Sequence, residues 1–386
     1  MNNIIKKTGI MPGITILFAL VTGTISTVHA EVIKKPPIIA KLQQLKQPLS
    51  KETKKWMNRW VGVDLEGPGF LYDQLSGNTG IYLKIRKINR TDLVDGHTAY
   101  GTFVTFHGPS NPDAEIAYFN LAAILGHDNI MRPAIPYTLG NKGTKGFKTL
   151  LKKELAIADP TSRRPVRIKR LLNWLETPPL RGGLKAHKPI SSITYQSFVD
   201  TPPGAIYGVP LETNPIVMAL QASNPQPIAG RKIQLKTGYT GDLLQLAREY
   251  SIIMTLDAIF QQWDRYSNTG NIGLAKDSAN IAHFYMTDNG GSDMSEEPAD
   301  VTRNLSYFSR YDRPSIQKLK QLYLFLLKPE RGFLGYKNAE KFVVDLGLYS
   351  EHSPATYVKL LQRNLHLVLN NVAAVELEYG NNAYLP

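Results

Sequence analysis

Two short segments near residue 265 contain the side chains that could do chemistry. The first, 263–271, reads WDRYSNTGN and carries Asp264 and Asn271; the second, 285–290, reads YMTDNG and carries Asp288. Carboxylate and amide oxygens are ligands that hard divalent cations such as Mg²⁺ take, and a further carboxylate can orient a hydroxyl group. Two aspartates and an asparagine in this order are the set that phosphoryl transfer needs at its reacting centre.

The chemistry of a nucleoside triphosphate suggests a role for each of these side chains. Its phosphates repel each other and the incoming nucleophile, so one or two divalent ions must bridge them. We expect Asp288 and Asn271 to hold those ions, and Asp264 to face the acceptor hydroxyl and orient it or accept its proton. A hairpin over 271–287 is expected to bring the two acidic groups together, because its two apolar runs are separated by a polar turn at 276–280.

Each segment taken alone has a simpler interpretation. Asp-Arg pairs are common, and the Asp-Asn-Gly sequence at 288–290 suits a tight turn, because Asn and Gly tolerate a positive φ. Two solvated turns do not explain why the segments follow one another so closely, behind a long apolar helical pattern at 243–260. The combination therefore favours a catalytic site.

Two blocks of the sequence also resemble a known family. The first is DAEIAYFNLAAILG at 113–126, a helical pattern that precedes Arg132-Pro133-Ala134. The second is the pair of WDR and DNG segments described above. Together, over residues 61–295, they resemble the atypical kinases of the secretory pathway, the Golgi casein kinase and four-jointed type, which are distant relatives of HipA and the phosphoinositide kinases.

The resemblance implies an α+β, two-lobed, protein-kinase-like fold with a β-rich small N-lobe and a mostly helical C-lobe. It also implies that ATP and Mg²⁺ or Mn²⁺ bind, with Asp264 as the catalytic aspartate and Asp288 as the metal-binding aspartate. Glu115 becomes the helix glutamate that pairs with a nucleotide-binding lysine on an earlier strand. Lys84 is the best match for that lysine, and Lys87 is the alternative.

Some positions depart from the family pattern. Tyr266 stands where a His often follows Asp-Arg, and Asn271 lies seven residues after Asp264, two beyond the five-residue spacing of the HipA and phosphoinositide branches. Asn268 is therefore an alternative metal ligand. The chain lacks the arginine-containing run that follows Asp-Asn-Gly in animal members, and it contains no cysteine, so the acceptor of the reaction is left open.

The first thirty residues have the layout of a cleaved export signal. Lys6 and Lys7 precede an apolar stretch at 14–21, and a small-residue cleavage site ends with Val28-His29-Ala30. The apolar stretch is far shorter than the roughly 20 residues that cross a bilayer, so we expect cleavage after Ala30 and no transmembrane segment. We expect a secreted protein, periplasmic, extracellular or delivered into a host cell as a bacterial effector, without disulfides or thiolate chemistry.

Changes in composition divide the chain into five parts. These are a signal peptide at 1–30, a tether and helix at 31–60, an N-lobe at 61–140, a basic insertion at 141–188, and a C-lobe with the catalytic loop and a helical tail at 189–386. The insertion, expected to be helical around 147–155 and 166–176, carries thirteen Lys or Arg residues in a chain of formal net charge +13. No zinc-finger spacing or RNA-binding motif indicates a specific nucleic acid, so docking of an acidic substrate is favoured.

These observations predict an exported, metal-dependent kinase that transfers the γ-phosphate of ATP to a hydroxyl of a protein, with a glycan or a small polyol as other acceptors. Two alternatives stay open. One is a catalytically inactive kinase fold that binds or activates a partner, and the other is a nucleotidyl or glutamyl transferase on the same fold. The sequence contains no HExxH or GxSxG motif, so hydrolase chemistry has no support.

Overall fold

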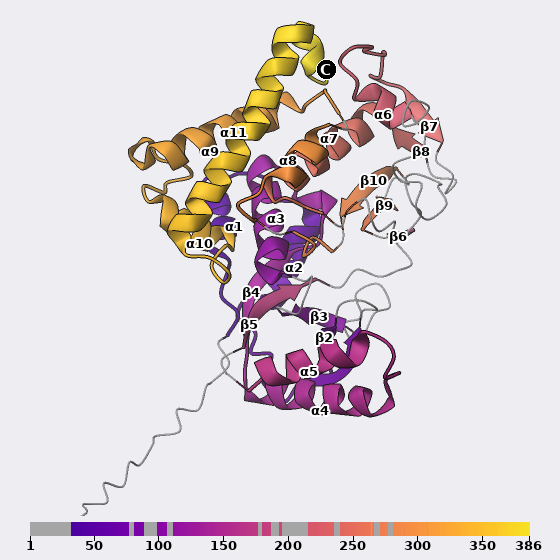
Figure 1. The fold of residues 1–386 in the computed structure, drawn as a ribbon, viewed down its shortest axis with the longest axis vertical. Helices are drawn as coiled ribbons and strands as arrows, with labels where there is room; N and C mark the ends of the chain where they lie inside the picture. Colours follow the sequence, from indigo (N-terminus) through magenta and orange to yellow (C-terminus); the bar gives the residue numbers. More distant parts are fainter. Residues whose placement is uncertain are drawn as a thin grey trace, which may run out of the picture.

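The computed structural model describes residues 32–76, 81–88, 99–105, 111–176, 180–186, 193–194, 215–234, 240–263, 265, 271–276, 281–286, 288–292, 294–306 and 308–386. These residues form two lobes, a smaller one built on an antiparallel sheet and a larger one built mainly of helices (Figure 1). The predicted α+β fold, with a β-rich N-lobe and a helical C-lobe, is confirmed. The export signal, Asp264, Asn268 and most of 189–214 lie outside the described residues. None of the described helices is long and apolar enough to cross a membrane.

The N-lobe is built on a five-stranded antiparallel sheet in the order β1-β2-β3-β5-β4. Its strands are β1 Phe70–Ser76, β2 Tyr82–Lys87, β3 Ala99–Val104, β4 Ala134–Leu139 and β5 Leu180–Lys185. In β5, Leu184 lies opposite Phe103 of β3 and Ile135 of β4. The predicted insertion at 141–188 therefore extends too far, because its last residues supply an inner strand of the sheet.

Alternation along the strands gives this sheet two different faces. One face carries a row of fully or almost fully buried apolar side chains, Leu83, Phe103, Leu184 and Ile135. The other carries the polar row Lys84, Thr102 and Lys185. Helices α4 (Asn141–Ile157) and α5 (Arg164–Trp174) cover the apolar face, and helix α3 (Pro112–Leu125) lies on the polar face, where a Cβ at Gly183 would lie 3.7 Å from Ile116. Lys185 is therefore directed toward α3.

Helix α3 lies between the two lobes and is buried along its whole length (Figure 1). It begins where the Asn111 side chain accepts hydrogen bonds from the N–H groups of Asp113 and Ala114. Pro112 fits the first turn, because no intrahelical N–H is needed there. The helix ends at Gly126, whose φ of 93° is left-handed. Both ends match the pattern read from 113–126.

Helices α4 and α5 form a hairpin where the sequence predicts two helices, on the outer face of the sheet (Figure 1). The Glu66 carboxylate fixes the start of α4, since it accepts hydrogen bonds from the N–H groups of Gly140, Lys142 and Gly143. Its charge also suits the positive end of the helix. A Cβ at Gly143 would lie 2.4 Å from Leu139 Cδ1, so glycine permits the close approach of α4 to the sheet.

The residues before the sheet form two helices, α1 Pro37–Gln44 and α2 Lys51–Trp60. Helix α2 ends at Trp60, as predicted. The prediction of a tether is wrong for α1, because Ile38, Ile39 and Leu42 are fully buried in the core. Their helical spacing places these apolar side chains on one face of α1, and the helix packs against α3.

The C-lobe combines two small sheets with a cluster of helices. One sheet has the order β10-β9-β6, with β6 Ile193–Thr194, β9 Ile272–Lys276 and β10 Ala282–Met286, and the other pairs β7 Lys232–Gln234 with β8 Thr240–Asp242. The pairing of β9 with β10 confirms the two strands of the predicted hairpin, whose turn residues 277–280 lie outside the described chain. The helices are α6 Pro215–Ala219, α7 Leu243–Ile259, α8 Ala299–Leu305, α9 Arg313–Leu327, α10 Ala339–Leu346 and α11 Pro354–Tyr379.

Gly347 ends α10 beside the start of α3, and its substitution tests how closely these helices pack. A Cβ at Gly347 would lie 2.5 Å from Ile116 Cγ2 and 3.2 Å from the backbone nitrogen of Ala117. We expect Gly347→Ala to lower the free energy of unfolding by about 2–5 kcal/mol, because overpacking adds to the cost of a left-handed alanine. Urea unfolding followed by circular dichroism measures this loss.

Gly126→Ala is the matched control for this substitution. Gly126 has the same left-handed role at the end of α3, but a Cβ there would meet only Lys318 Nζ, at 3.8 Å. Gly126→Ala should therefore lower the free energy of unfolding only by the cost of a left-handed alanine, about 1–2 kcal/mol. Equal losses in the two variants would contradict the close packing of α10 on α3.

Candidate active site

A buried ion pair joins the sheet to helix α3. The Lys185 ammonium, at the end of β5, lies 2.5 Å from Glu115 Oε1 in the first turn of α3. Only 7% of the lysine side chain and 3% of the glutamate side chain are exposed. Taking either charge out of water costs several kcal/mol, so each group depends on the other for its place in the interior.

The lysine that pairs with Glu115 is thus Lys185. The prediction that Lys84, or alternatively Lys87, makes this pair is wrong. Lys84 lies on β2, and β3 runs between β2 and β5. Neighbouring strands are about 4.8 Å apart, so the Lys84 backbone is roughly 10 Å from that of Lys185 in the same cross-strand row. Lys87 is exposed at the end of β2. The order of the strands brings β5, and not β2, next to Glu115.

Tyr82 connects this ion pair to the turn that carries Asp288. Its ring centroid lies 5.4 Å from the Lys185 ammonium, and its hydroxyl donates a 3.2 Å hydrogen bond to Asp288 Oδ1. Glu115, Lys185, Tyr82 and Asp288 therefore form a continuous line from one lobe to the other. A lysine, the kind of side chain that can bind phosphate oxygens, and an aspartate, the kind that can bind their metal ion, therefore lie on either side of one tyrosine.

The backbone at Asp288 is strained. Its φ is 53°, in the left-handed region, which is costly for a residue with a side chain and recurs at functional sites. Two residues later, the Gly290 carbonyl accepts a 3.0 Å hydrogen bond from the Asn111 N–H at the start of α3. The turn that carries Asp288 and the helix that carries Glu115 are therefore joined by a direct backbone contact.

Arg265, the residue after Asp264, is the centre of a buried hydrogen-bond network. Its guanidinium donates to Asp257 Oδ1 at 3.0 Å, to the Asn271 carbonyl at 2.7 Å and to Asn289 Oδ1 at 2.8 Å. Arg265 is 1% exposed and Asp257 is fully buried, so this charge pair is desolvated. Asn271 and Asn289 belong to the two predicted motifs, which Arg265 therefore holds together.

Tyr118 of α3 completes this network. Its hydroxyl donates a 2.9 Å hydrogen bond to Asp257 Oδ1 on α7. Burial raises the pKa of Tyr118 well above its ordinary value, so the hydroxyl stays a donor at every physiological pH. The helix that carries Glu115 is thereby tied to the helix that leads into the first motif.

Asp264 itself lies outside the described residues, but the chain just before it is described. The Trp263 N–H donates a 3.1 Å hydrogen bond to the Gly291 carbonyl, and Gln262 forms an antiparallel bridge with Ser292. The segment that leads to Asp264 therefore runs beside the segment that follows the Asp-Asn-Gly turn. The described ends of the two motifs, Trp263 and Gly291, are therefore in direct contact.

The Asp288 side chain is partly buried and contacts Tyr82. In the part of the chain that the structure describes, it pairs with no Lys or Arg side chain. Asn271 is 6% exposed at the start of β9, beside the end of β10 that leads to Asp288. No group of three or more His, Cys, Asp or Glu side chains that could hold a metal occurs among the described residues. Amide oxygens, phosphates or Asp264 would complete the shell, and the choice between Asn271 and Asn268 stays a prediction.

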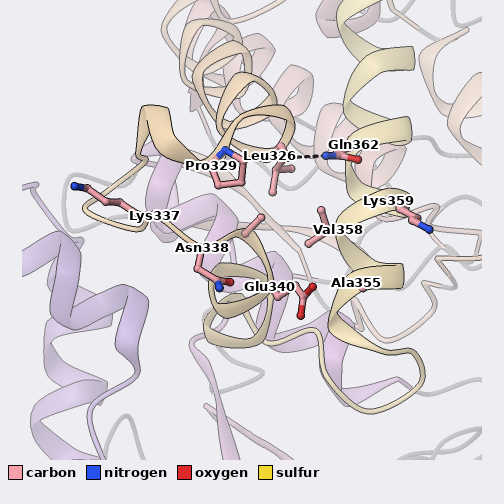
Figure 2. Close-up of a pocket in the computed structure, with 10 residues that line it drawn as sticks. Leu326, Pro329, Lys337, Asn338, Glu340, Ala355, Val358, Lys359 and Gln362 are labelled. Atoms are coloured by element: carbon pink, nitrogen blue, oxygen red, sulfur yellow. Dashed lines mark hydrogen bonds between the residues drawn. The ribbon is translucent and has the colours of Figure 1, made fainter.

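A cavity elsewhere in the C-lobe lacks this chemistry. It measures about 480 Å³ and lies between the ends of α9, α10 and α11 (Figure 2). Leu326 and Val358 give it an apolar wall, and the Gln362 side chain donates a 2.6 Å hydrogen bond to the Leu326 carbonyl. Glu340 is the single carboxylate among its described lining residues. The lysine and the aspartate that could bind phosphate and metal lie instead along the line that ends at Asp288.

Sequence reasoning missed Lys185, Tyr82 and Asp257. A signal for the lysine strand was present in Gly182 and Gly183, because glycines inside a strand mark the close approach of another backbone. A Cβ at Gly182 would lie 2.3 Å from the Val104 carbonyl oxygen. Tyr82 carries no such local signal, since its partner Asp288 is distant in the sequence, and Asp257 contacts the distant Tyr118 as well as the nearby Arg265.

Removal of one charge from the buried pair leaves the other unpaired. We expect Lys185→Met to lower the free energy of unfolding by about 3–5 kcal/mol, and Lys84→Met, in the same cross-strand row, by about 0.5 kcal/mol or less. Lys185→Met combined with Glu115→Gln should recover part of the loss, since no charge is then left unpaired. Urea unfolding of the three variants checks this, and a larger loss for Lys84→Met would contradict the pairing.

Comparison with known proteins gives a distant likeness of fold. No protein-family model and no curated protein matches this sequence. Among solved structures, the crystal structure of the Golgi casein kinase with Mn/ADP bound is similar over 90% of this chain and 91% of that chain, with a TM-score of 0.49 and 12% sequence identity.

Proposed function

We propose that this chain is an exported, metal-dependent kinase that transfers the γ-phosphate of ATP to a hydroxyl group of a protein. The observation that carries the proposal is the line of Glu115, Lys185, Tyr82 and Asp288 across the boundary between the lobes. In kinases, ATP lies between two such lobes, with a lysine–glutamate ion pair at its phosphates and an aspartate at the metal. A buried lysine with its own glutamate is the most specific part of that pattern.

Each side chain in this line has a distinct proposed role. Lys185, in place of Lys84, binds phosphate oxygens, and Glu115 holds its ammonium in position. Asp288 holds Mg²⁺ or Mn²⁺ together with Asn271 or Asn268. A bound ion bridges the phosphate oxygens and neutralises the charge that develops on them during transfer.

Asp264 is proposed to orient the acceptor hydroxyl and accept its proton. The Arg265 network supports this role, because it ties the residue after Asp264 to the Asn289 side chain by a 2.8 Å hydrogen bond. Phosphoryl transfer depends mainly on positioning and electrostatic stabilisation, so a buried and fully paired guanidinium is a suitable support for the reacting groups.

Export and an acidic acceptor are part of the proposal. The signal-like residues 1–30 and the absence of cysteine favour a periplasmic, extracellular or host-delivered protein. Outside the cytoplasm of the producing cell, a kinase depends on a compartment that supplies ATP, and a host cell is one. The excess of basic side chains favours an acidic protein or glycan over a neutral acceptor.

The position of the transferred group tests the reaction type. The purified protein is incubated with Mn²⁺, a mixture of hydroxyl-bearing acidic peptides, and ATP labelled at either the α- or the γ-phosphate. We expect label on the peptides from γ-labelled ATP alone. Label from the α-phosphate would identify nucleotidyl transfer. If the protein binds no nucleotide at all, the result would contradict the kinase proposal and favour a partner-binding protein.

Two substitutions separate nucleotide binding from turnover. Asp288→Asn removes the charge of the proposed metal ligand, so calorimetry should detect no Mn²⁺-dependent binding of nucleotide. Asp264→Asn should bind nucleotide as the unaltered protein does and lower the transfer rate by about 100-fold or more. Unchanged turnover in Asp264→Asn would rule out the role assigned to this carboxylate.

Tyr82 supplies a third test, because its hydroxyl competes with a metal ion for the Asp288 carboxylate. The 3.2 Å hydrogen bond from Tyr82 must weaken when a cation takes that oxygen. We expect Tyr82→Phe to tighten Mn²⁺ binding about fivefold, since a hydrogen bond contributes about 1 kcal/mol net. Calorimetric titration is repeated in the Asp288→Asn background, where Tyr82→Phe should restore no Mn²⁺ binding. A gain that persists there would show that Tyr82 does not act through Asp288.

A further inference from the structure

Helix α4 and the two residues that follow α5 border a cavity on the outer side of the N-lobe. Its volume is about 460 Å³, and Lys145, Lys148 and Lys152 line it from α4. Glu176, just after α5, also lines it and pairs with Lys148 at 3.0 Å. Within the described chain, Lys145 and Lys152 have no carboxylate partner. The α4 wall of this cavity is therefore positively charged.

The spacing of these lysines suits an extended acidic segment. Lys145 and Lys152 are seven residues apart on one helix, which corresponds to two turns and about 10 Å along its axis. They lie on the same side of α4 with Lys148 between them. In a chain with the extended polyproline II conformation, which has three residues per turn and rises about 3.1 Å per residue, two carboxylates three residues apart lie on the same side and are separated by about 9 Å. One short segment can therefore reach both lysines at once.

The lysine row is held in a fixed orientation by the contacts of α4 with the sheet. Phe147 and Leu151 are fully buried on the inner side of the helix. The Lys142 ammonium donates hydrogen bonds of 2.6 and 2.7 Å to the carbonyls of Gly67 and Phe70. Because these contacts prevent rotation of the helix, the lysines stay directed at the cavity in spite of their mutual repulsion.

We propose that this cavity docks an acidic segment of the acceptor, in which two carboxylates three residues apart bind Lys145 and Lys152. The identity of the partner as an acceptor rests on the proposed kinase function. Lys185 lies on the opposite face of the sheet from α4, so the docked segment does not touch the reacting atoms. Docking instead raises the concentration of the acceptor near the site, which lowers KM and leaves kcat unchanged.

A nucleic acid fits this surface less well. Duplex binding needs a run of cations along the phosphate backbone. Here Lys142 is engaged by backbone carbonyls, Lys148 by Glu176, and Arg164 by Glu154. Single strands commonly stack on aromatic rings, and no aromatic side chain is among the described residues that line the cavity.

Docking is measured without phosphoryl transfer. A fluorescein-labelled peptide of alanine and glycine, with two glutamates three residues apart, is titrated with the intact protein in low salt and without nucleotide. Lys145→Gln combined with Lys152→Gln should weaken binding about tenfold, because two exposed charge pairs are lost. A peptide with adjacent glutamates should bind the unaltered protein more weakly than the spaced peptide, and added salt should weaken both.

Lys337→Gln combined with Lys359→Gln is the matched control. Both lysines border the C-lobe cavity of about 480 Å³, on opposite sides of it (Figure 2), so the control removes the same charge from a cavity of similar size. It should bind the spaced peptide as the unaltered protein does. Equal loss of binding in the two double variants, or no loss in either, would overturn the proposal.

Two further measurements separate the remaining outcomes. A duplex oligonucleotide is titrated in parallel, and if it binds through Lys145 and Lys152 while the peptide does not, the surface is a nucleic-acid site and the proposal fails. With an acidic acceptor peptide, Lys145→Gln combined with Lys152→Gln should raise KM about tenfold at constant kcat. A changed kcat would contradict docking at a distance from the reacting atoms. Phosphorylation of a peptide without acidic residues reports the kinase reaction alone, so failure of docking and failure of the kinase are distinguishable.

Discussion

Lys185 and Glu115 are buried charges that are stable only in contact with each other, and this requirement constrains much of the chain around them. Strand β5 and the first turn of α3 have to meet, because a separated ammonium and carboxylate would each bear the full cost of desolvation. The start of α3 is bonded in turn to the Gly290 carbonyl, which relates the turn of Asp288 to the ion pair. One electrostatic requirement thus links a strand and a helix to a turn of the other lobe.

Arg265 is the corresponding buried cation of the C-lobe. Its guanidinium offers five donors in one plane, so it can serve the Asp257 carboxylate, the Asn271 carbonyl and the Asn289 side chain together. A lysine at this position could not reach the three acceptors in the same geometry. Lys185 and Arg265 are thus two buried cations, one in each lobe, and Tyr82 contacts both Lys185 and Asp288.

The sequence predicted the elements whose signals are local. Helix α3 has an asparagine cap and a terminal glycine, and the strands of the hairpin at 271–287 show the expected apolar runs. The sequence did not identify Lys185 as the partner of Glu115, because that pairing depends on β5 entering the sheet between β3 and β4 after two helices. Strand order is a tertiary property that local propensity does not encode. In a segment rich in lysine and arginine, Lys185 was also indistinguishable from its solvated neighbours. The role of Asp264 stays a prediction, since the described residues end on either side of it.

The location of a bound metal and nucleotide tests this account most directly. In crystals of the protein grown with ADP and Mn²⁺, we expect the anomalous signal of Mn²⁺ about 2–2.5 Å from an Asp288 carboxylate oxygen. A phosphate oxygen should lie within about 3 Å of the Lys185 ammonium, which keeps its contact with Glu115. A nucleotide bound away from this line, or a phosphate held by Lys84 while Lys185 contacts only Glu115, would contradict the account.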